Sequence, residues 1–143
     1  MNVTVRGRTR HYRTVSFDAA KNQVRLIEQR LLPHEFKVVG TRDFRAFRSS
    51  RDVRQGTVRT IMQADVRDGD GGDPRAVTFD VVGTAFMHNM VRIVVGTLVD
   101  VARGRIDRGA IARALASGRR DHLGATAPAH GLCLEEIRLS LPP

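Results

Sequence analysis

Residues Gly83 to Arg105, GTAFMHNMVRIVVGTLVDVARGR, carry the strongest structural signal in this chain. Apolar side chains recur in it with the helical period of 3.6 residues, on two neighbouring faces. One face holds Phe86, Met90, Val94, Leu98 and Val101, and the other holds Met87, Val91, Val95, Val99 and Ala102. The pattern predicts a long helix that is apolar over most of its circumference and therefore buried.

A narrow polar stripe interrupts this apolar surface. Its members are His88, Asn89, Arg92, Gly96, Asp100 and Arg103. Arg92 is flanked by apolar side chains, and a guanidinium removed from water needs a counter-charge. A carboxylate or a phosphate suits it, because either accepts two parallel hydrogen bonds from the planar group. Two interpretations stay open from the pattern: an arginine that pairs with an acidic residue of its own domain, and an arginine that serves a site.

The rest of the chain alternates strand and helix patterns. Strands are predicted at Tyr12 to Phe17, Thr57 to Arg67, Ala76 to Gly83 and Leu132 to Leu139, and a helix at Ala19 to Leu32 that ends before Pro33. An acidic turn, Asp68 to Pro74, joins the middle two strands. The fold class that follows is α+β: an antiparallel sheet of three or four strands, backed by helices on one face.

Two aspartates are expected to begin helices. Asp43 suits the N-cap of a helix that carries Phe44 and Phe47 on one face, and Asp107 suits the N-cap of a short helix that runs to Ser117. Arg42, Arg45 and Arg48 would then recur along the first of these helices. They form either a ridge that follows phosphates or an ordinary solvated face.

Composition indicates a basic protein of one domain. The chain has 143 residues and a net charge of +9, and 22 of its 24 basic residues are arginine. Arginine binds phosphate and stacks on bases, so nucleic acid is the expected partner. The single cysteine, Cys133, excludes an internal disulfide, argues against a zinc site and is expected in the core. No apolar run reaches membrane-spanning length, and we predict a cytoplasmic protein without a metal site.

Four segments in order carry a resemblance to a known family. They are GTRDFRAF at Gly40 to Phe47, VRTI at Val58 to Ile61, FMHNMVRIVVGTL at Phe86 to Leu98, and GATAPAHGLCL at Gly124 to Leu134. Together they resemble the C-terminal half of TruA-type tRNA pseudouridine synthases. The resemblance implies half of the pseudouridine-synthase fold at residues 40–143, preceded by a divergent segment at residues 1–39 with one strand and one helix.

The resemblance also implies a chemistry. The family isomerises uridine to pseudouridine in the anticodon stem-loop of tRNA, with no metal or organic cofactor. An aspartate in a Gly-Arg-Thr-Asp motif is the nucleophile, a basic residue pairs with it, and a tyrosine packs on the target base. Arg92 matches the pairing residue. Tyr12, in a segment that resembles the family's Arg-x-Tyr-Arg strand, matches the tyrosine, although an ordinary strand aromatic with its hydroxyl in water is an equal alternative.

The nucleophilic motif itself is not found. Gly7-Arg8-Thr9-Arg10 has an arginine in place of the aspartate and lies too close to Tyr12. Residues 19–37 also depart from the family, and Arg42 replaces its usual histidine. Three hypotheses follow: a synthase whose other half is separate or missing from the gene model, a non-catalytic basic RNA-binding module, and a decayed fragment.

The remaining site predictions concern RNA and protein partners. Candidate contacts with tRNA are Arg10, Arg13, Arg42, Arg45, Arg48, Arg51, Arg59, His88 and His130. A half that stands alone would expose a sheet edge and apolar surface. We therefore expect either a homodimer or a complex with a complementary N-terminal half, and no association with a membrane.

Overall fold

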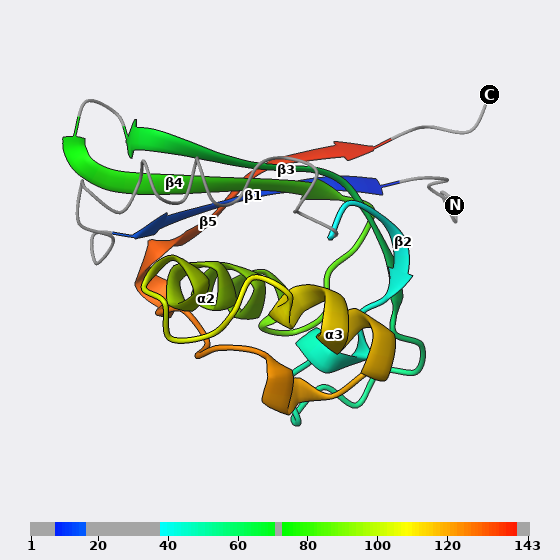
Figure 1. Ribbon diagram of the computed structural model, residues 1–143. Helices are drawn as coiled ribbons and strands as arrows, with labels where there is room; N and C mark the ends of the chain where they lie inside the picture. Colours follow the sequence, from blue (N-terminus) through cyan, green and yellow to red (C-terminus); the bar gives the residue numbers. More distant parts are fainter. Residues whose placement is uncertain (1–7, 17–37, 71–72, 140–143) are drawn as a thin grey trace.

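The computed structural model describes residues 8–16, 38–70 and 73–139, which form an antiparallel sheet of five strands with helices on one face (Figure 1). The strands are β1 (Arg8–Ser16), β2 (Gly40–Asp43), β3 (Val58–Asp70), β4 (Asp73–Gly83) and β5 (Leu132–Leu139). Their order across the sheet is β2-β3-β4-β1-β5. The α+β prediction is confirmed. The predicted strand number was too low, because β2 has only four residues and none of them is buried.

The helices are α2 (Met90–Ala102) and α3 (Ala110–Ser117), with short 3-10 turns η2 (Arg45–Phe47), η3 (Arg120–His122) and η4 (Ala129–Gly131). In the described part of the chain, no helix is long and apolar enough to cross a membrane. The predicted helix at Ala19 to Leu32 and the predicted end of the first strand at Phe17 lie outside the described residues.

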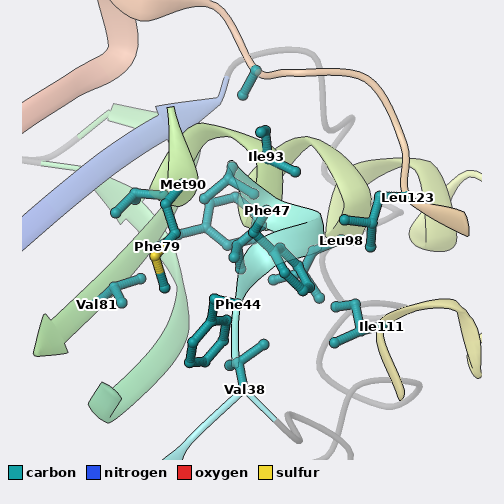
Figure 2. Close-up of a cluster of buried hydrophobic side chains, with 14 of the residues drawn as sticks. Val38, Phe44, Phe47, Phe79, Val81, Met90, Ile93, Leu98, Ile111 and Leu123 are labelled. Atoms are coloured by element: carbon teal, nitrogen blue, oxygen red, sulfur yellow. The ribbon is translucent and has the colours of Figure 1, made fainter. Parts of the chain in front are cut away.

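The core lies between the sheet and α2. Alternate residues of β4, Val77, Phe79 and Val81, are at most 3% exposed and face the helix side, as the strand period requires. Figure 2 shows the cluster that they join, with Met90 and Ile93 of α2. Burying a large apolar side chain stabilises the fold by about 1.5–3 kcal/mol, so this layer holds α2 on the sheet.

The boundaries of α2 differ from the prediction. Asn89 has a φ of 63°, in the left-handed region that asparagine tolerates better than most residues, and the helix begins only after it. Phe86 and Met87 therefore precede the helix, yet both are buried, at 5% and 4% exposure. Their apolar character reflects burial in a loop, which the helical period cannot distinguish from burial on a helix.

Both predicted N-caps are wrong in detail. Asp43 is the last residue of β2, and its carboxylate accepts a hydrogen bond from the backbone N–H of Arg45 at 3.0 Å. Asp107 stands before α3, whose N-cap is Gly109, and it accepts the Gly109 N–H at 2.8 Å. Both aspartates thus organise a turn that precedes a helix and are not its first residue.

Three further expectations are corrected. The acidic turn at Asp68 to Pro74 is shorter than predicted, because Asp70 pairs with Asp73 in the hairpin of β3 and β4. The three-residue spacing of Arg42, Arg45 and Arg48 forms no helical ridge, since these residues lie in β2, in η2 and after η2. Cys133 is exposed, because β5 is the last strand of the sheet and both its faces reach solvent beyond Leu132.

Candidate active site

A pocket of about 380 Å³ opens where the N-terminus of α2 meets β1 and the start of β5. Its apolar wall includes Tyr12, Phe86 and Leu132, and its polar wall includes Arg92, with His88, Asn89 and Arg54 also lining it. The pocket therefore brings together three of the predicted site residues: Arg92 in the first turn of α2, His88 just before it, and Tyr12 from β1. An apolar pocket with a few convergent polar groups is the usual form of a ligand site.

Arg92 is held in a fixed orientation by two hydrogen bonds. Its Nε donates to the carbonyl oxygen of Ala127 at 2.7 Å, and its Nη1 donates to Oδ1 of Asn89 at 2.9 Å. Within the described residues, no carboxylate pairs with this guanidinium and its Nη2 has no hydrogen-bond partner. The interpretation in which Arg92 pairs with an acidic residue of its own domain is thus not supported by the described part, and Nη2 is left for another acceptor.

The segment 124–127 runs along the polar stripe of α2 and fixes Arg92 from outside. The N–H of Ala127 donates to the carbonyl of Arg92 at 2.9 Å, the N–H of Ala125 to Asp100 at 3.0 Å, and the N–H of Gly124 to Thr97 Oγ1 at 3.0 Å. Asp100 is thus bonded to this segment and to Arg105 rather than to Arg92. Two residues of the stripe, Arg92 and Asp100, therefore serve to bind this backbone segment.

Gly96 permits that docking. A Cβ atom at this position would lie 1.7 Å from the carbonyl oxygen of Ala125, well inside van der Waals contact. The segment 124–127 therefore fills the space beside Gly96, one turn of α2 after Arg92.

An ion pair between the buried Asp52 and the half-exposed Arg54 holds the loop before α2. Asp52, whose side chain is 3% exposed, accepts two hydrogen bonds from the guanidinium of Arg54, at 3.0 and 2.7 Å, and one from the backbone N–H of His88 at 2.8 Å. The hydrogen bonds from Arg54, and then that from His88, lower the pKa of the Asp52 carboxyl well below its usual range. An ionised Asp52 thus positions the pocket wall at His88 and Asn89.

Tyr12 and Phe86 form the aromatic wall. Their ring centroids are 5.3 Å apart and the rings are nearly perpendicular, at 89°, a favourable edge-to-face arrangement. Tyr12 pairs with the buried Val81 across the sheet, so it projects to the helix side, toward the pocket. A flat ligand such as a base would find an aromatic surface beside the guanidinium of Arg92.

The predicted RNA contact Arg13 lies on the other face of the sheet. Its Nε donates to Asp80 at 3.2 Å, and its Nη1 lies 3.3 Å from Glu135. Asp80 also binds His11 at 2.7 Å and Arg67 at 2.9 Å. Burial raises the pKa of the Asp80 carboxyl, but the hydrogen bonds from Arg67, His11 and Arg13 outweigh burial and the net pKa is lowered.

The other predicted contacts are spread out. Arg42 and Arg59 lie opposite each other on β2 and β3, and Arg10 lies on β1 two residues from Tyr12. Arg45 donates from Nη2 to the carbonyl of Ser117 at 3.2 Å. Arg51 and His130 are exposed, and neither lines the pocket. These arginines and His130 stay predictions as tRNA contacts.

Sequence reasoning missed Asp52, Arg54 and the role of Asn89. The Asp-x-Arg spacing in the loop before β3 was the available signal for an ion pair, but nothing local shows that its carboxylate reaches His88. In the residues that the structure describes, no group of three or more His, Cys, Asp or Glu could hold a metal ion.

Comparison with known proteins identifies the family. The family described as tRNA pseudouridine synthase matches residues 36–139. The tRNA pseudouridine synthase A of Geotalea daltonii is 45% identical over 100 residues, which cover 69% of this chain and 39% of that protein. The Acetivibrio thermocellus protein of the same name is 42% identical over 99 residues, covering 69% and 39%. The tRNA pseudouridine synthase A 1 of Bacillus cereus is 39% identical over 99 residues, covering 69% and 38%.

The chain therefore belongs to the tRNA pseudouridine synthase family, and the predicted resemblance to its TruA type is confirmed. The chain spans about two-fifths of the length of these relatives.

Proposed function

We propose that this domain forms one wall of the active site of a synthase that converts uridine to pseudouridine in the anticodon stem-loop of tRNA. The observation that carries the proposal is the geometry of Arg92. Its guanidinium is fixed by Ala127 and Asn89, and its Nη2 is without a partner in the described residues, at a pocket with an aromatic wall.

In this reaction Arg92 pairs with the nucleophilic aspartate. A guanidinium beside a carboxylate favours its ionised form and aims it. The aspartate attacks the target nucleotide, the bond between the sugar and N1 of the base breaks, and the base turns. Carbon-5 then bonds to the sugar as the aspartate carboxylate is released, the hydrogen on carbon-5 leaves as a proton, and N1 takes up a proton. The target base has left its stack, and Tyr12 with Phe86 supplies a replacement aromatic surface.

The aspartate comes from outside this sequence in our proposal. The 143 residues contain no Gly-Arg-Thr-Asp. The described Asp52, Asp80 and Asp100 are each bonded to arginines other than Arg92. The source that we propose for it is a complementary N-terminal half; a second copy of the chain could only add a dimer interface, because it has the same sequence and no such motif.

Strand β5 supports the presence of such a partner. Within the described sheet it pairs with β1 alone, and it exposes Leu134, Ile137 and Leu139 at 43%, 46% and 53%. An unpaired edge with exposed apolar side chains favours the addition of further strands.

The test is tritium release from tRNA labelled at carbon-5 of uridine. We expect release when this chain is mixed with the separately expressed N-terminal half of a relative, such as the Geotalea daltonii enzyme. The Arg92→Ala variant in the same mixture should release no tritium above background. Failure of a folded mixture that binds tRNA would reject the catalytic proposal.

A second candidate is a non-catalytic RNA-binding module. The net charge of +9 and the lack of a carboxylate beside Arg92 in the described part favour it. It predicts salt-sensitive tRNA binding and no tritium release in any mixture. Aggregation without RNA binding would instead indicate a decayed fragment.

A further inference from the structure

Two arginines carry buried N–H groups that lack an acceptor. These groups are the Nε–H of Arg10 and the Nε–H of Arg59. Among the buried side-chain nitrogen and oxygen atoms of the described residues, these two have no hydrogen-bond partner. A buried donor without an acceptor destabilises the fold, and more so when the group is charged. A native fold rarely keeps such groups unless an acceptor arrives from elsewhere.

Both arginines project from the same face of the sheet. Gly83 of β4 pairs with Arg10 on one side and with Ile61 on the other, so Arg10 shares the face of Ile61. Arg59 precedes Ile61 by two residues and shares that face too. Because Ile61 is 1% exposed and belongs to the core cluster, this face is the helix side, the same side as the pocket.

A third arginine faces Arg59. Arg42 of β2 lies directly across from Arg59 in the register, and like charges in that position repel. Arg59 Nη1 donates to the carbonyl of Val58 at 2.8 Å, and Arg42 Nε donates to the carbonyl of Val39 at 3.4 Å. No carboxylate of the described residues forms an ion pair with Arg10, Arg42 or Arg59. Anions bound along the row would remove the repulsion between Arg42 and Arg59 and would satisfy the buried donors of Arg10 and Arg59.

The three arginines adjoin the pocket. Arg10 is two residues from Tyr12 on one face of β1, and Gly83 lies beside Arg10. A Cβ atom on Gly83 would lie 2.8 Å from Cζ of Phe86, so Phe86 covers Gly83. The row thus begins next to the aromatic wall and continues to Arg59, two strands or roughly 10 Å away.

We propose that Arg10, Arg42 and Arg59 bind backbone phosphates of the nucleotides that flank the one in the pocket. The inference rests on the proposed function, since it takes the pocket as the place of the target base. Phosphate is the favoured anion because three permanent charges in a row match a chain of regularly spaced phosphates, whereas one carboxylate would neutralise one of them. A planar guanidinium also donates two parallel hydrogen bonds to phosphate oxygens.

The first test measures binding of a fluorescently labelled anticodon stem-loop over a series of salt concentrations, with fluorescence anisotropy as the signal. Arg10→Gln and Arg59→Gln should each weaken binding roughly five- to tenfold and lower the slope of affinity against salt by about one. The matched control is Arg119→Gln, which removes the same charge from an exposed arginine already paired with Asp121. Equal losses in control and site variants would overturn the proposal.

The second test separates a phosphate site from a structural or protein-binding role. The arginine Nε–H signals of Arg10 and Arg59 in NMR spectra should shift on addition of the stem-loop, while that of Arg119 stays in place. Thermal melts of Arg59→Gln without RNA should match or exceed the parent, because an unsatisfied charge has been removed. Signals that move only when an N-terminal half is added would show that a protein carboxylate is the partner, and would overturn the proposal.

These results are independent of turnover. Stem-loop binding through the three arginines without tritium release in any mixture would leave the phosphate site standing and reject the catalytic function. Tritium release with unchanged KM in Arg10→Gln and Arg59→Gln would support the catalytic function and reject the phosphate site.

Discussion

The two faces of the sheet handle positive charge in opposite ways. On the face away from the helices, Asp80 takes three basic partners, His11, Arg13 and Arg67. On the helix side, Arg92 and the row of Arg10, Arg42 and Arg59 have no carboxylate partner among the described residues. The described basic residues around Asp80 thus have a counter-charge within the domain, whereas the four arginines on the helix side have none among the described residues. In our proposals, the helix side is the face that meets RNA and the nucleophilic carboxylate.

The largest expected effect is on turnover. Arg92→Ala should lower the rate of tritium release by roughly 100- to 1,000-fold in the mixture with an N-terminal half, because the charge that orients the nucleophile is removed. Stem-loop affinity should change much less. A matched Arg92→Lys variant keeps the charge but loses the fork that holds Ala127 and Asn89, and should recover only a small part of the rate. Loss of binding in parallel with loss of rate would contradict this assignment.

The next effect concerns the backbone that fixes Arg92. Gly96→Ala forces a methyl group against the carbonyl of Ala125, so we expect the free energy of unfolding to fall by about 1–3 kcal/mol. Urea denaturation followed by circular dichroism measures this. Ala116→Val, at an exposed position of α3, is the control and should cost only about 0.5 kcal/mol through helix propensity. Equal stability of the two variants would mean that the close approach of Ala125 to Gly96 is not needed for the fold.

The sheet face that carries Asp80 should contribute to the stability of the fold but not to the function of the pocket. Asp80→Asn leaves Arg13 and Arg67 without their shared counter-charge, and we expect a loss of about 1–2 kcal/mol in unfolding free energy. Tritium release per folded molecule should stay within about twofold of the parent, since the pocket is on the other face. A large fall in the rate at a temperature where the variant is fully folded would break the distinction between the two faces.

The smallest effect is a pH dependence that originates in Asp52. Its pKa is lowered in the folded state by Arg54 and His88, so its contribution to stability is complete above the usual pKa of aspartate. That contribution is lost as the pH falls below about 4 toward the folded value. Urea midpoints measured from pH 7 to pH 3 should fall less steeply in Asp52→Asn than in the parent. Parallel pH profiles would show that the ion pair with Arg54 has no net effect on stability.

Several elements were predictable because their signals are local. The long run of Val and Ile around Arg92 fixes a buried helix, and the hairpin of β3 and β4 follows from alternating strands around an acidic, glycine-rich segment. The edge strand β2 was missed because its four residues bury no alternate side chain, which removes the period that marks a strand. Cys133 was misplaced for a related reason: a strand pattern does not reveal whether the strand is central or last in the sheet.

The amino-acid sequence alone predicts a basic α+β domain of the tRNA pseudouridine synthase family, with one arginine set in an apolar helix. Which charges are satisfied follows only from the tertiary fold. Arg10 and Arg13 are three residues apart on β1, yet the pleat sends them to opposite faces, where only Arg13 meets Asp80. Likewise Arg92 owes its orientation to Ala127, which lies 35 residues away in the chain. Counter-charges and hydrogen-bond partners come from strands and loops distant in sequence, and no local pattern records them.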